Sequence, residues 1–371
     1  MPLLSRPSSR ITVLGAGLMG RLLAVALAED GHPLEIHDAG GPDADQSAAR
    51  VAAAMLAPLA ESAVSEPAIV RMSQHAMRRW PELLATLPRP VFFQRNGTLI
   101  VWHRQDATHA ASLHDKFLRT QGLLPDLPAA ESLDDAQLAQ HEPALAGRFH
   151  QGLYLPGEGQ LDNRQLLAAL HERMQQLGVT THWHSAKALN DFSPGTPGEP
   201  DLLLDCRGLG AREDWPELRG VRGEVIRVHA PEVTLQRPTR LVHPRYPAYI
   251  VPKEDHVFVI GATAIESDDL SPASVRSTLE LLSAAYAVHP GFAEARILEI
   301  ATQCRPALPD NNPRIRRVGE RILQINGLYR HGFLIAPALL DAALQLLREG
   351  GSPLADTFGL AITQRELEGA A

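Results

Sequence analysis

The chain has 371 residues, of which 44% are hydrophobic and 21% are charged, and its net charge is −8. This length and composition indicate a globular protein with two packed domains, and an acidic balance without a basic run argues against nucleic acid or anionic membranes as partners. The two cysteines, Cys206 and Cys304, cannot form a disulfide framework. Because the sequence has no apolar run of signal-peptide or transmembrane length, we expect a cytoplasmic protein.

The first predicted unit is a β-α-β arrangement over residues 10–38, with three glycines after its first strand. Gly15 allows a tight turn, Gly17 lets the backbone approach a pyrophosphate, and Gly20 lets the helix pack close to the strand. The helix N-terminus offers free N–H groups to phosphates. Asp38 ends the second strand, where its carboxylate can accept hydrogen bonds from both hydroxyls of a ribose. The unit predicts dinucleotide binding and leaves NAD and FAD open.

The next segment, residues 47–58, consists largely of small side chains. Two interpretations stay open: a helix, since alanine has the highest helix propensity, or a segment kept small because a large flat ligand lies against it. Apolar residues at helical spacing predict a helix over 68–87. A proline break at 88–90 leads into two predicted strands, 91–94 and 97–102.

The middle of the chain alternates helical and extended patterns. We expect a helix over 107–120, a polar, acidic linker from there to residue 142, and a short strand over 152–156. Asp162 is the expected N-cap of a long helix. The apolar run 201–205 ends in glycines, which is typical of the carboxyl edge of a nucleotide-binding sheet.

From residue 223 the pattern changes to a period of two, which is typical of antiparallel strands. The expected elements are a strand over 224–229, a hairpin of 249–252 and 256–261, a helix over 272–287, a strand over 321–326 and a helix over 333–348. The order of elements predicts an α/β fold in which a Rossmann-like, nucleotide-binding domain is interleaved with an antiparallel-sheet substrate domain.

The two domains are expected to be discontinuous in sequence. We assign residues 9–88, 143–222 and 300–371 to the nucleotide-binding domain, and residues 89–142 and 223–299 to the substrate-binding domain.

Sixteen histidines raise the question of a metal site. His182 and His184 alternate along a predicted strand, where two side chains on one face can chelate an ion. No Cys, Asp or His at a suitable spacing supplies a third ligand, so a half-exposed strand is the better interpretation and no metal is expected.

Six blocks of residues follow one another through nearly the whole chain. They are 15–20; 52–58; 97–99; 249–252 with 261–263; 304–306 with Asp310 and Pro313; and 327–337. In this order the blocks resemble FAD-dependent amino-acid oxidases related to D-amino acid oxidase, and most closely the glycine oxidases of thiamine biosynthesis. The last block, which precedes a helix, is the most specific.

The resemblance implies non-covalent binding of FAD, whose flavin ring would pass the turn at 327–333. The cofactor-binding residues that it implies are Gly15, Ala16, Gly17, Leu18, Met19, Gly20, Asp38, Ala53, Ala54, Met55, Leu56, Lys187, Gly208, Gly327, Leu328, Tyr329, Arg330, His331, Gly332, Phe333 and Leu334. Ala54 stands where the family commonly has glycine, and Leu328 replaces a polar residue or histidine. For His331, a capping or packing role is favoured over titration.

The resemblance also implies the substrate site. Arg305 matches the arginine that binds the substrate carboxylate, for which a guanidinium offers two parallel charge-assisted bonds. Tyr249 matches a tyrosine that adds a hydroxyl to the same carboxylate, although Tyr246 is the alternative that could point inward. Arg330 matches a second arginine at the site's mouth. Ala264 stands where glycine oxidases carry a larger methionine, so the match leaves selectivity for glycine open.

The implied reaction is the FAD-dependent oxidation of glycine or another small amino acid, with a hydride passing from Cα to flavin N5. Water then converts the imine to an oxo acid and ammonia, and oxygen reoxidises the flavin to give hydrogen peroxide. The expected partners are a small amino-acid or amine substrate and O2, and a homo-oligomer is compatible with the sequence. The product would feed thiazole formation in thiamine biosynthesis.

Three other readings stay open. The substrate could be that of a D-amino acid oxidase or dehydrogenase, or of a sarcosine-type secondary-amine oxidase. The Leu18–Met19 pair also fits NAD-dependent hydroxyacid dehydrogenases, but these have an all-helical second domain. A non-catalytic flavin-binding protein would not need Arg305 and Tyr249. Cys304 lies in the region where sarcosine oxidases carry flavin covalently, but the surrounding pattern is absent here, which favours a small buried residue.

Overall fold

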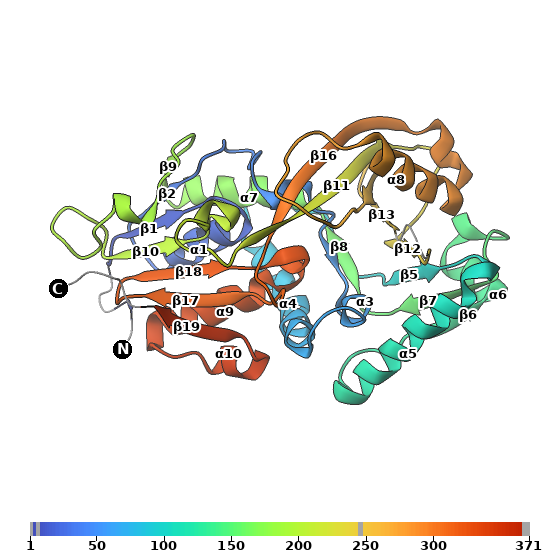
Figure 1. The fold of residues 1–371 in the computed structure, drawn as a ribbon, viewed down its shortest axis with the longest axis horizontal. Helices are drawn as coiled ribbons and strands as arrows, with labels where there is room; N and C mark the ends of the chain where they lie inside the picture. The colour runs from blue at the N-terminus through green and yellow to red at the C-terminus, as the bar shows by residue number, and fades with distance from the viewer. Residues whose placement is uncertain (1–2, 5–7, 244–247, 366–371) are drawn as a thin grey trace.

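The computed structural model describes residues 3–4, 8–243 and 248–365, and sheets of seven, nine and three strands organise it. Figure 1 shows the seven-stranded sheet with its helices at one end of the molecule and the nine-stranded sheet at the other. The long strands β11 (Arg219–His229) and β16 (Arg296–Ala307) run between the two ends.

The seven-stranded sheet has the order β19-β17-β18-β10-β1-β2-β9. Its strands are β1 (Ile11–Leu14), β2 (Leu34–His37), β9 (Thr180–His182), β10 (Leu202–Asp205), β17 (Arg314–Val318), β18 (Ile322–Asn326) and β19 (Ala361–Arg365). β1 lies between β2 and β10 and is parallel to both, so three strand ends meet at one carboxyl edge. Such edges are where open α/β sheets bind ligands.

Five of the described helices pack their apolar faces on this sheet. They are α1 (Leu18–Glu29), α4 (Pro67–Ala85), α7 (Asn163–Gln176), α9 (Gly332–Glu349) and α10 (Pro353–Phe358). The largest hydrophobic core joins them to the strands, and α9 is buried along most of its length. Trp80 of α4 is fully buried and donates its indole N–H to the Phe333 carbonyl at 2.9 Å, which ties α4 to the start of α9.

The nine-stranded sheet is mostly antiparallel, with the order β15-β11-β14-β13-β12-β5-β7-β6 and with β16 paired to β11. Its further strands are β5 (Thr98–Val101), β6 (Glu131–Asp134), β7 (Gln151–Leu155), β12 (Thr239–Leu241), β13 (Ala248–Pro252), β14 (Val257–Gly261) and β15 (Ile265–Glu266). Helices α5 (Ala107–Leu123), α6 (Asp135–His141) and α8 (Val275–Val288) accompany this sheet. Strand β7 and the start of β11 belong here, although both fall in the segment 143–222 assigned above to the other domain.

A small sheet joins the two parts. It consists of β3 (Met55–Leu56), β8 (Gly159–Leu161) and β4 (Phe93–Gln94). Two short helices, α2 (Ala48–Val51) and α3 (Pro58–Ser62), flank β3. The segment 47–58 is therefore helical only at its start and is then extended, so the continuous-helix interpretation was wrong.

Several predicted elements are confirmed. The β-α-β unit is present, and Asp162 caps α7 by accepting hydrogen bonds from the backbone N–H groups of Arg164 and Gln165, both at 2.8 Å. The predicted hairpin is formed by β13 and β14. No helix in the described part of the chain is long and apolar enough to span a membrane.

The predicted linker between residues 120 and 142 was wrong, because it contains β6 and α6. Only Leu133 of β6 is buried, so the strand shows almost no alternation in the sequence. Helix α6 starts with a capping box, in which the Asp134 carboxylate accepts from the Gln137 N–H and the Gln137 side chain accepts from the Asp134 N–H. The polar composition of the segment concealed both elements. Tyr246, the alternative to Tyr249, lies outside the described residues.

Candidate active site

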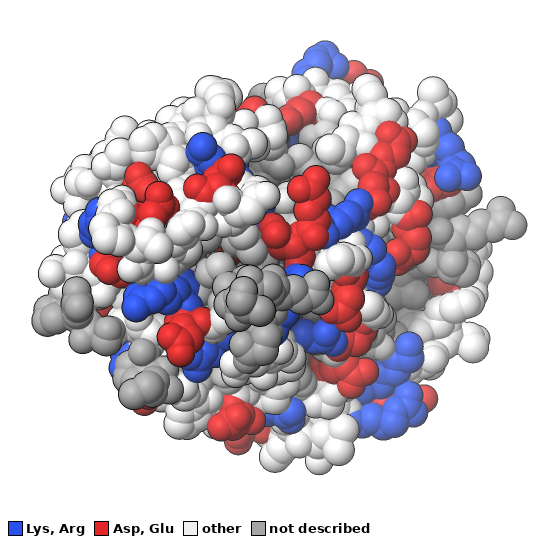
Figure 2. All heavy atoms as spheres, turned by 60° about the vertical axis from the view of Figure 1, so that its left-hand side comes forward, with Lys and Arg blue, Asp and Glu red and all other residues white. Residues whose placement is uncertain are grey.

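A cavity of about 930 Å³ lies between the carboxyl edge of the seven-stranded sheet and one face of the nine-stranded sheet. We call it the central cavity. Gly15, Gly17 and Asp38 line its nucleotide end, and Tyr249 and Arg305 line its substrate end. On the described surface in Figure 2, on the side of the seven-stranded sheet, acidic and basic side chains are interspersed rather than gathered in one large patch.

Most of the predicted site residues line the central cavity. They are Gly15, Gly17, Leu18, Met19, Asp38, Ala53, Ala54, Met55, Lys187, Gly208, Tyr249, Ala264, Arg305, Leu328, Tyr329, Arg330, Gly332, Phe333 and Leu334. Five others, Ala16, Gly20, Leu56, Gly327 and His331, are not among the lining residues. Segments from both ends of the chain thus meet around one space.

The glycine turn at the nucleotide end depends on missing side chains. Gly15 has φ +91°, and a Cβ there would lie 2.6 Å from the Cys206 carbonyl oxygen. A Cβ at Gly20 would overlap the Gly15 carbonyl oxygen, so this glycine sets the closeness of α1 to β1 rather than lining the cavity. Gly17 precedes α1, and no side chain caps the helix. The helix start therefore presents backbone N–H groups toward this end of the cavity.

Asp38 follows β2 and closes the same end. Its Oδ2 accepts a hydrogen bond from the Ala16 N–H at 2.5 Å, and its Oδ1 accepts one from the Gly40 N–H at 2.7 Å. These two bonds orient the carboxylate between the glycine turn and the loop after β2.

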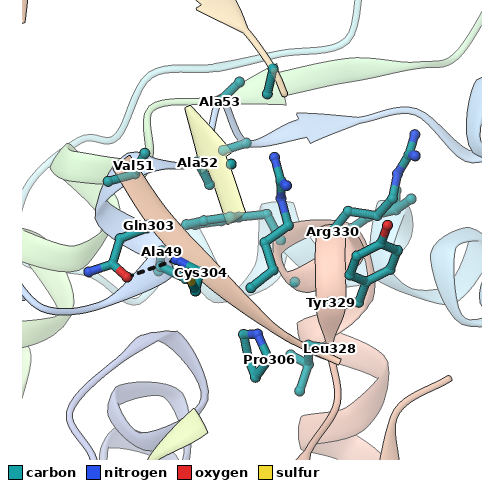
Figure 3. Close-up of a pocket in the computed structure, with 18 of the residues that line it drawn as sticks. Ala49, Val51, Ala52, Ala53, Gln303, Cys304, Pro306, Leu328, Tyr329 and Arg330 are labelled. Atoms are coloured by element: carbon teal, nitrogen blue, oxygen red, sulfur yellow. Dashed lines mark hydrogen bonds between the residues drawn. The ribbon is translucent and has the colours of Figure 1, made fainter. Parts of the chain in front are cut away.

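One wall of the cavity is made of small residues from the segment 47–58. Figure 3 shows Val51, Ala52 and Ala53 on the upper side of the view, Ala49 near the middle, and Pro306 and Leu328 on the lower side. Ala54 has φ +52°, a left-handed conformation that favours glycine. Glycine would adopt this conformation without the steric cost of a Cβ. The second interpretation of the segment, small residues around a ligand space, agrees with its place on the cavity wall.

The substrate end is built on one row of residues across the nine-stranded sheet. Tyr249 on β13 lies beside Gly261 of β14 on one side and Arg240 of β12 on the other. The Tyr249 ring lies over Gly261, where a Cβ would come 2.7 Å from the hydroxyl oxygen. Burial raises the pKa of Tyr249, so its hydroxyl keeps its proton and can donate a hydrogen bond.

Arg305 comes from β16. Its Nη1 donates to the Thr263 carbonyl at 3.0 Å, and its guanidinium lies over Gly223, where a Cβ would overlap it. Among the described residues no carboxylate forms an ion pair with Arg305, so its positive charge is directed to the cavity without a protein counter-ion.

Glu61 of α3 holds two further arginines. Its Oε1 lies 2.9 Å from Arg240 Nη2, and its Oε2 lies 2.9 Å from Arg330 Nε. Burial disfavours the Glu61 carboxylate, but Arg330, Arg240 and His331 outweigh burial and hold its pKa well below the ordinary value. Glu61 and Arg240 both line the cavity and were not predicted, because no local pattern distinguishes a functional acid in a helix or an arginine in a strand.

His331 is buried behind this cluster. Its Nδ1 lies 3.5 Å from Glu61 Oε2, and its Nε2 lies 3.4 Å from Ser65 Oγ. Burial lowers the pKa of His331 to about 4, so the imidazole is neutral at pH 7. Gly327 supports the same turn with φ +78°, and a Cβ there would lie 2.8 Å from the Leu308 side chain.

Cys304 is 3% exposed, and burial raises the pKa of its thiol. The Sγ atom lies 3.4 Å from the Ser267 carbonyl oxygen, to which the thiol donates. A protonated, hydrogen-bonded thiol is a poor nucleophile, which agrees with a packing role.

The parallel pairing of β2 with β9 brings Glu35, His37 and His182 together, with ligating atoms all within 4.8 Å of one another. His184 is not part of this group. The His37 and His182 rings stack with centroids 4.3 Å apart, and Thr12 donates to Glu35 at 2.8 Å. The group could not be found from the sequence, because its members lie on strands far apart in the chain.

Comparison with known proteins gives the family. Residues 10–342 match the family described as FAD dependent oxidoreductase (DAO). The "Putative thiamine biosynthesis oxidoreductase ThiO" of Rhizobium etli is 41% identical over 350 residues, which cover 93% of this chain and 98% of that protein. A "Bifunctional protein ThiO/ThiG" of Synechocystis sp. is 26% identical, and the match covers 95% of this chain but only 53% of that longer protein.

Two solved structures have the same fold. A glycine oxidase from Geobacillus kaustophilus superposes with a TM-score of 0.78 at 24% identity, over 94% of this chain and 98% of that one. An iminodiacetate oxidase from Chelativorans sp. BNC1 superposes with a TM-score of 0.78 at 21% identity, over 95% of this chain and 99% of that one. The family match spans every strand of both sheets except β19, together with the whole central cavity, and the chain belongs to the FAD-dependent oxidoreductase family.

Proposed function

We propose that this protein oxidises glycine or another small amino acid in thiamine biosynthesis, giving an oxo acid, ammonia and hydrogen peroxide. The observation that carries the proposal is the guanidinium of Arg305. It lies near the Tyr249 hydroxyl and faces the cavity, and it has no protein counter-ion among the described residues. The relative from Rhizobium etli, named for thiamine biosynthesis, and the fold shared with a glycine oxidase support it.

The central cavity fits FAD. Its volume lies at the upper end of the range for small-molecule sites, as a dinucleotide requires. We propose that the backbone of the glycine turn and the α1 N-terminus hold the pyrophosphate, and that Asp38 receives the ribose hydroxyls. The wall at 53–55 and the turn at 327–334 would flank the flavin, without a covalent bond. Bound FAD supplies the hydride acceptor.

The residues at the substrate end would orient the amino acid. Arg305 would bind its carboxylate through two parallel bonds and Tyr249 would donate a third. Three arginines surround the Tyr249 hydroxyl against the single carboxylate of Glu61. This surplus of positive charge favours the neutral amine over the ammonium form of the substrate, because like charges repel. A neutral amine has the lone pair that stabilises the developing iminium, so no protein base is required.

A secondary amine is the second candidate substrate. The observation that favours it is Ala264, a small side chain at the substrate end, which leaves room for a substituent. We also propose the division into two discontinuous domains given above, with β7 and the start of β11 moved to the substrate-binding domain. We further propose a cytoplasmic location and O2 as electron acceptor. A homo-oligomer stays a prediction.

The proposal is tested by anaerobic reduction of the yellow holoenzyme with glycine, sarcosine, proline and D-amino acids. Arg305→Ala should lower kcat/KM for the substrate by about 30- to 1000-fold, since losing a bidentate carboxylate contact costs on the order of 2–4 kcal/mol. Arg276→Ala, at a side chain 77% exposed on α8, is the control for loss of one positive charge. A flavoprotein that glycine and the other amines fail to bleach would contradict the proposal.

A further inference from the structure

Lys253 is a buried lysine in a place where lysines are usually exposed. It follows β13 at the start of the tight turn to β14, yet its side chain folds inward and the residue is only 8% exposed. The chain has only three lysines among its 35 Lys and Arg residues, so a lysine here is unusual for this sequence.

The ammonium of Lys253 has a complete set of acceptors. Its Nζ donates to the Leu161 carbonyl at 2.7 Å, to the Ala53 carbonyl at 2.9 Å and to Gln160 Oε1 at 3.2 Å. Three N–H donors thus meet three oxygens, which suits a compact ammonium better than a planar guanidinium. Among the described residues no carboxylate forms an ion pair with it. Burial lowers the pKa of Lys253 to about 7.

One of the carbonyl groups that Lys253 binds, that of Ala53, belongs to the cavity wall. Asn163, which is fully buried, binds the same segment nearer its start by donating to the carbonyls of Ala49 at 2.8 Å and Arg50 at 2.7 Å. The wall from 49 to 54 is therefore held from behind by side chains, while its small residues face the cavity (Figure 3).

The contacts of Ala53 show at which end of the cavity this part of the wall lies. Ala53 packs in one cluster with Val225 and Tyr249, so it lies at the substrate end. The Lys253 ammonium lies 2.9 Å from the carbonyl oxygen of Ala53, which is itself a lining residue of the cavity. A buried charge without a counter-ion acts strongly at this range, because little water screens it.

We propose that Lys253 is a positioning residue of the FAD site, which fixes the wall at Ala53 and Ala54 and places a positive charge behind the flavin. The charge favours the reduced cofactor, which carries more negative charge than the oxidised form. The proposal rests on the family's FAD and on the placement of the flavin against the wall at 53–55 given under the proposed function. It does not depend on which amine is the substrate.

Three variants separate the two parts of this role. Lys253→Met loses the charge and the donors, Lys253→Gln keeps donors without the charge, and Lys253→Arg keeps the charge. The measurements are the two-electron reduction potential of the holoenzyme at pH 6, by equilibration with a redox dye, and the release of FAD on dilution, by flavin fluorescence. Neither measurement requires a substrate.

We expect the potential to become more negative in Lys253→Gln and Lys253→Met and to stay near the wild-type value in Lys253→Arg. A tenfold loss of preference for the reduced cofactor corresponds to about 30 mV. FAD release should be at least about tenfold easier in Lys253→Met, since three buried acceptors lose their donor. Arg276→Met, which removes an exposed positive charge, should change neither quantity.

A wild-type potential in Lys253→Gln would overturn the electrostatic part, and unchanged FAD release in Lys253→Met would overturn the positioning part. If Lys253→Met does not fold, the comparison of Lys253→Gln with Lys253→Arg still decides between charge and hydrogen bonding. Failure of glycine and the other amines to bleach the flavin would contradict the proposed function alone, because these tests use no amine substrate.

Discussion

The two ends of the central cavity are built in different ways. The nucleotide end is formed mostly by backbone groups between residues 15 and 40, and its glycines leave the space that side chains would otherwise fill. At the substrate end, charged side chains from α3, β12, β16 and the turn before α9 meet around Tyr249.

The difference shows how each end obtains its specificity. The conformation of a backbone turn depends on which dihedral angles its own residues allow, so the sequence of one short segment determines it. A cluster of charges depends on strand register and on helix placement, since its members approach only after folding. The nucleotide end should therefore be sensitive to added volume, and the substrate end to changed charge.

The nucleotide end is tested by Gly20→Ala. The new Cβ would overlap the Gly15 carbonyl oxygen, so α1 must move away from β1. Overpacking at such a site costs about 3 kcal/mol, on the order of 100-fold in FAD affinity. The flavin-to-protein absorbance ratio after purification measures it. Gly122→Ala in α5, where a Cβ meets nothing within 4 Å, should retain FAD and gain up to about 1 kcal/mol of stability.

A Gly20→Ala protein that keeps a full complement of FAD would contradict the expectation that added side-chain volume disrupts the nucleotide end.

The substrate end is tested by Glu61→Gln. The change leaves Arg240 and Arg330 without their shared carboxylate, and loss of one partner of a buried ion pair costs about 3–5 kcal/mol. Urea unfolding of the holoenzyme measures the loss. Glu280→Gln, in a partly exposed pair with Arg276 whose atoms lie 3.9 Å apart, should cost less than about 0.5 kcal/mol. Equal stabilities of Glu61→Gln and Glu280→Gln would mean that the cluster is not an energetic unit.

The pH dependence of stability also tests the charge cluster at the substrate end. The pKa of His331 is about 4 in the folded protein, below the ordinary value of 6.5, because burial favours the neutral ring. Its contribution to stability is therefore complete above pH 6.5 and is lost as the pH falls toward 4. At pH 5 the wild type should lose about 2 kcal/mol more than His331→Asn, relative to pH 7.5. His150→Gln, at an exposed histidine, is the control and should lose stability with falling pH as the wild type does. If the stability of His331→Asn and of the wild type fell equally with pH, His331 would not contribute to the pH dependence.

The smallest effect is expected from Ala54→Gly, on the wall between the two ends. A non-glycine residue with φ +52° costs about 1–2 kcal/mol, and glycine loses about 0.5–1 kcal/mol more backbone entropy on folding, so a net gain of at most about 1.5 kcal/mol should follow. Ala52→Gly, where φ is −58°, should instead lose stability. Thermal unfolding of both variants compares them, and a lower Tm for Ala54→Gly would show that the left-handed backbone is not strained.

The sequence predicted the fold well where a pattern is local. The glycine turn, the Asp162 cap, the β13–β14 hairpin and the final strand and helix each follow from residues within one segment. It failed for β6 and α6, because an edge strand with one buried residue has no visible alternation. For the site, it predicted Arg305 and Tyr249 only through resemblance to a family.

Residues near to one another in the chain thus determined the turn for a dinucleotide and the order of helices and strands. The tertiary structure alone decided that Glu61 joins Arg240 to Arg330, and that Lys253 turns inward to Ala53 rather than out to solvent. The physical reason is the range of the interactions. Backbone conformation is set by each residue and its neighbours, whereas ion pairs and buried hydrogen bonds depend on which segments the folded sheets bring together.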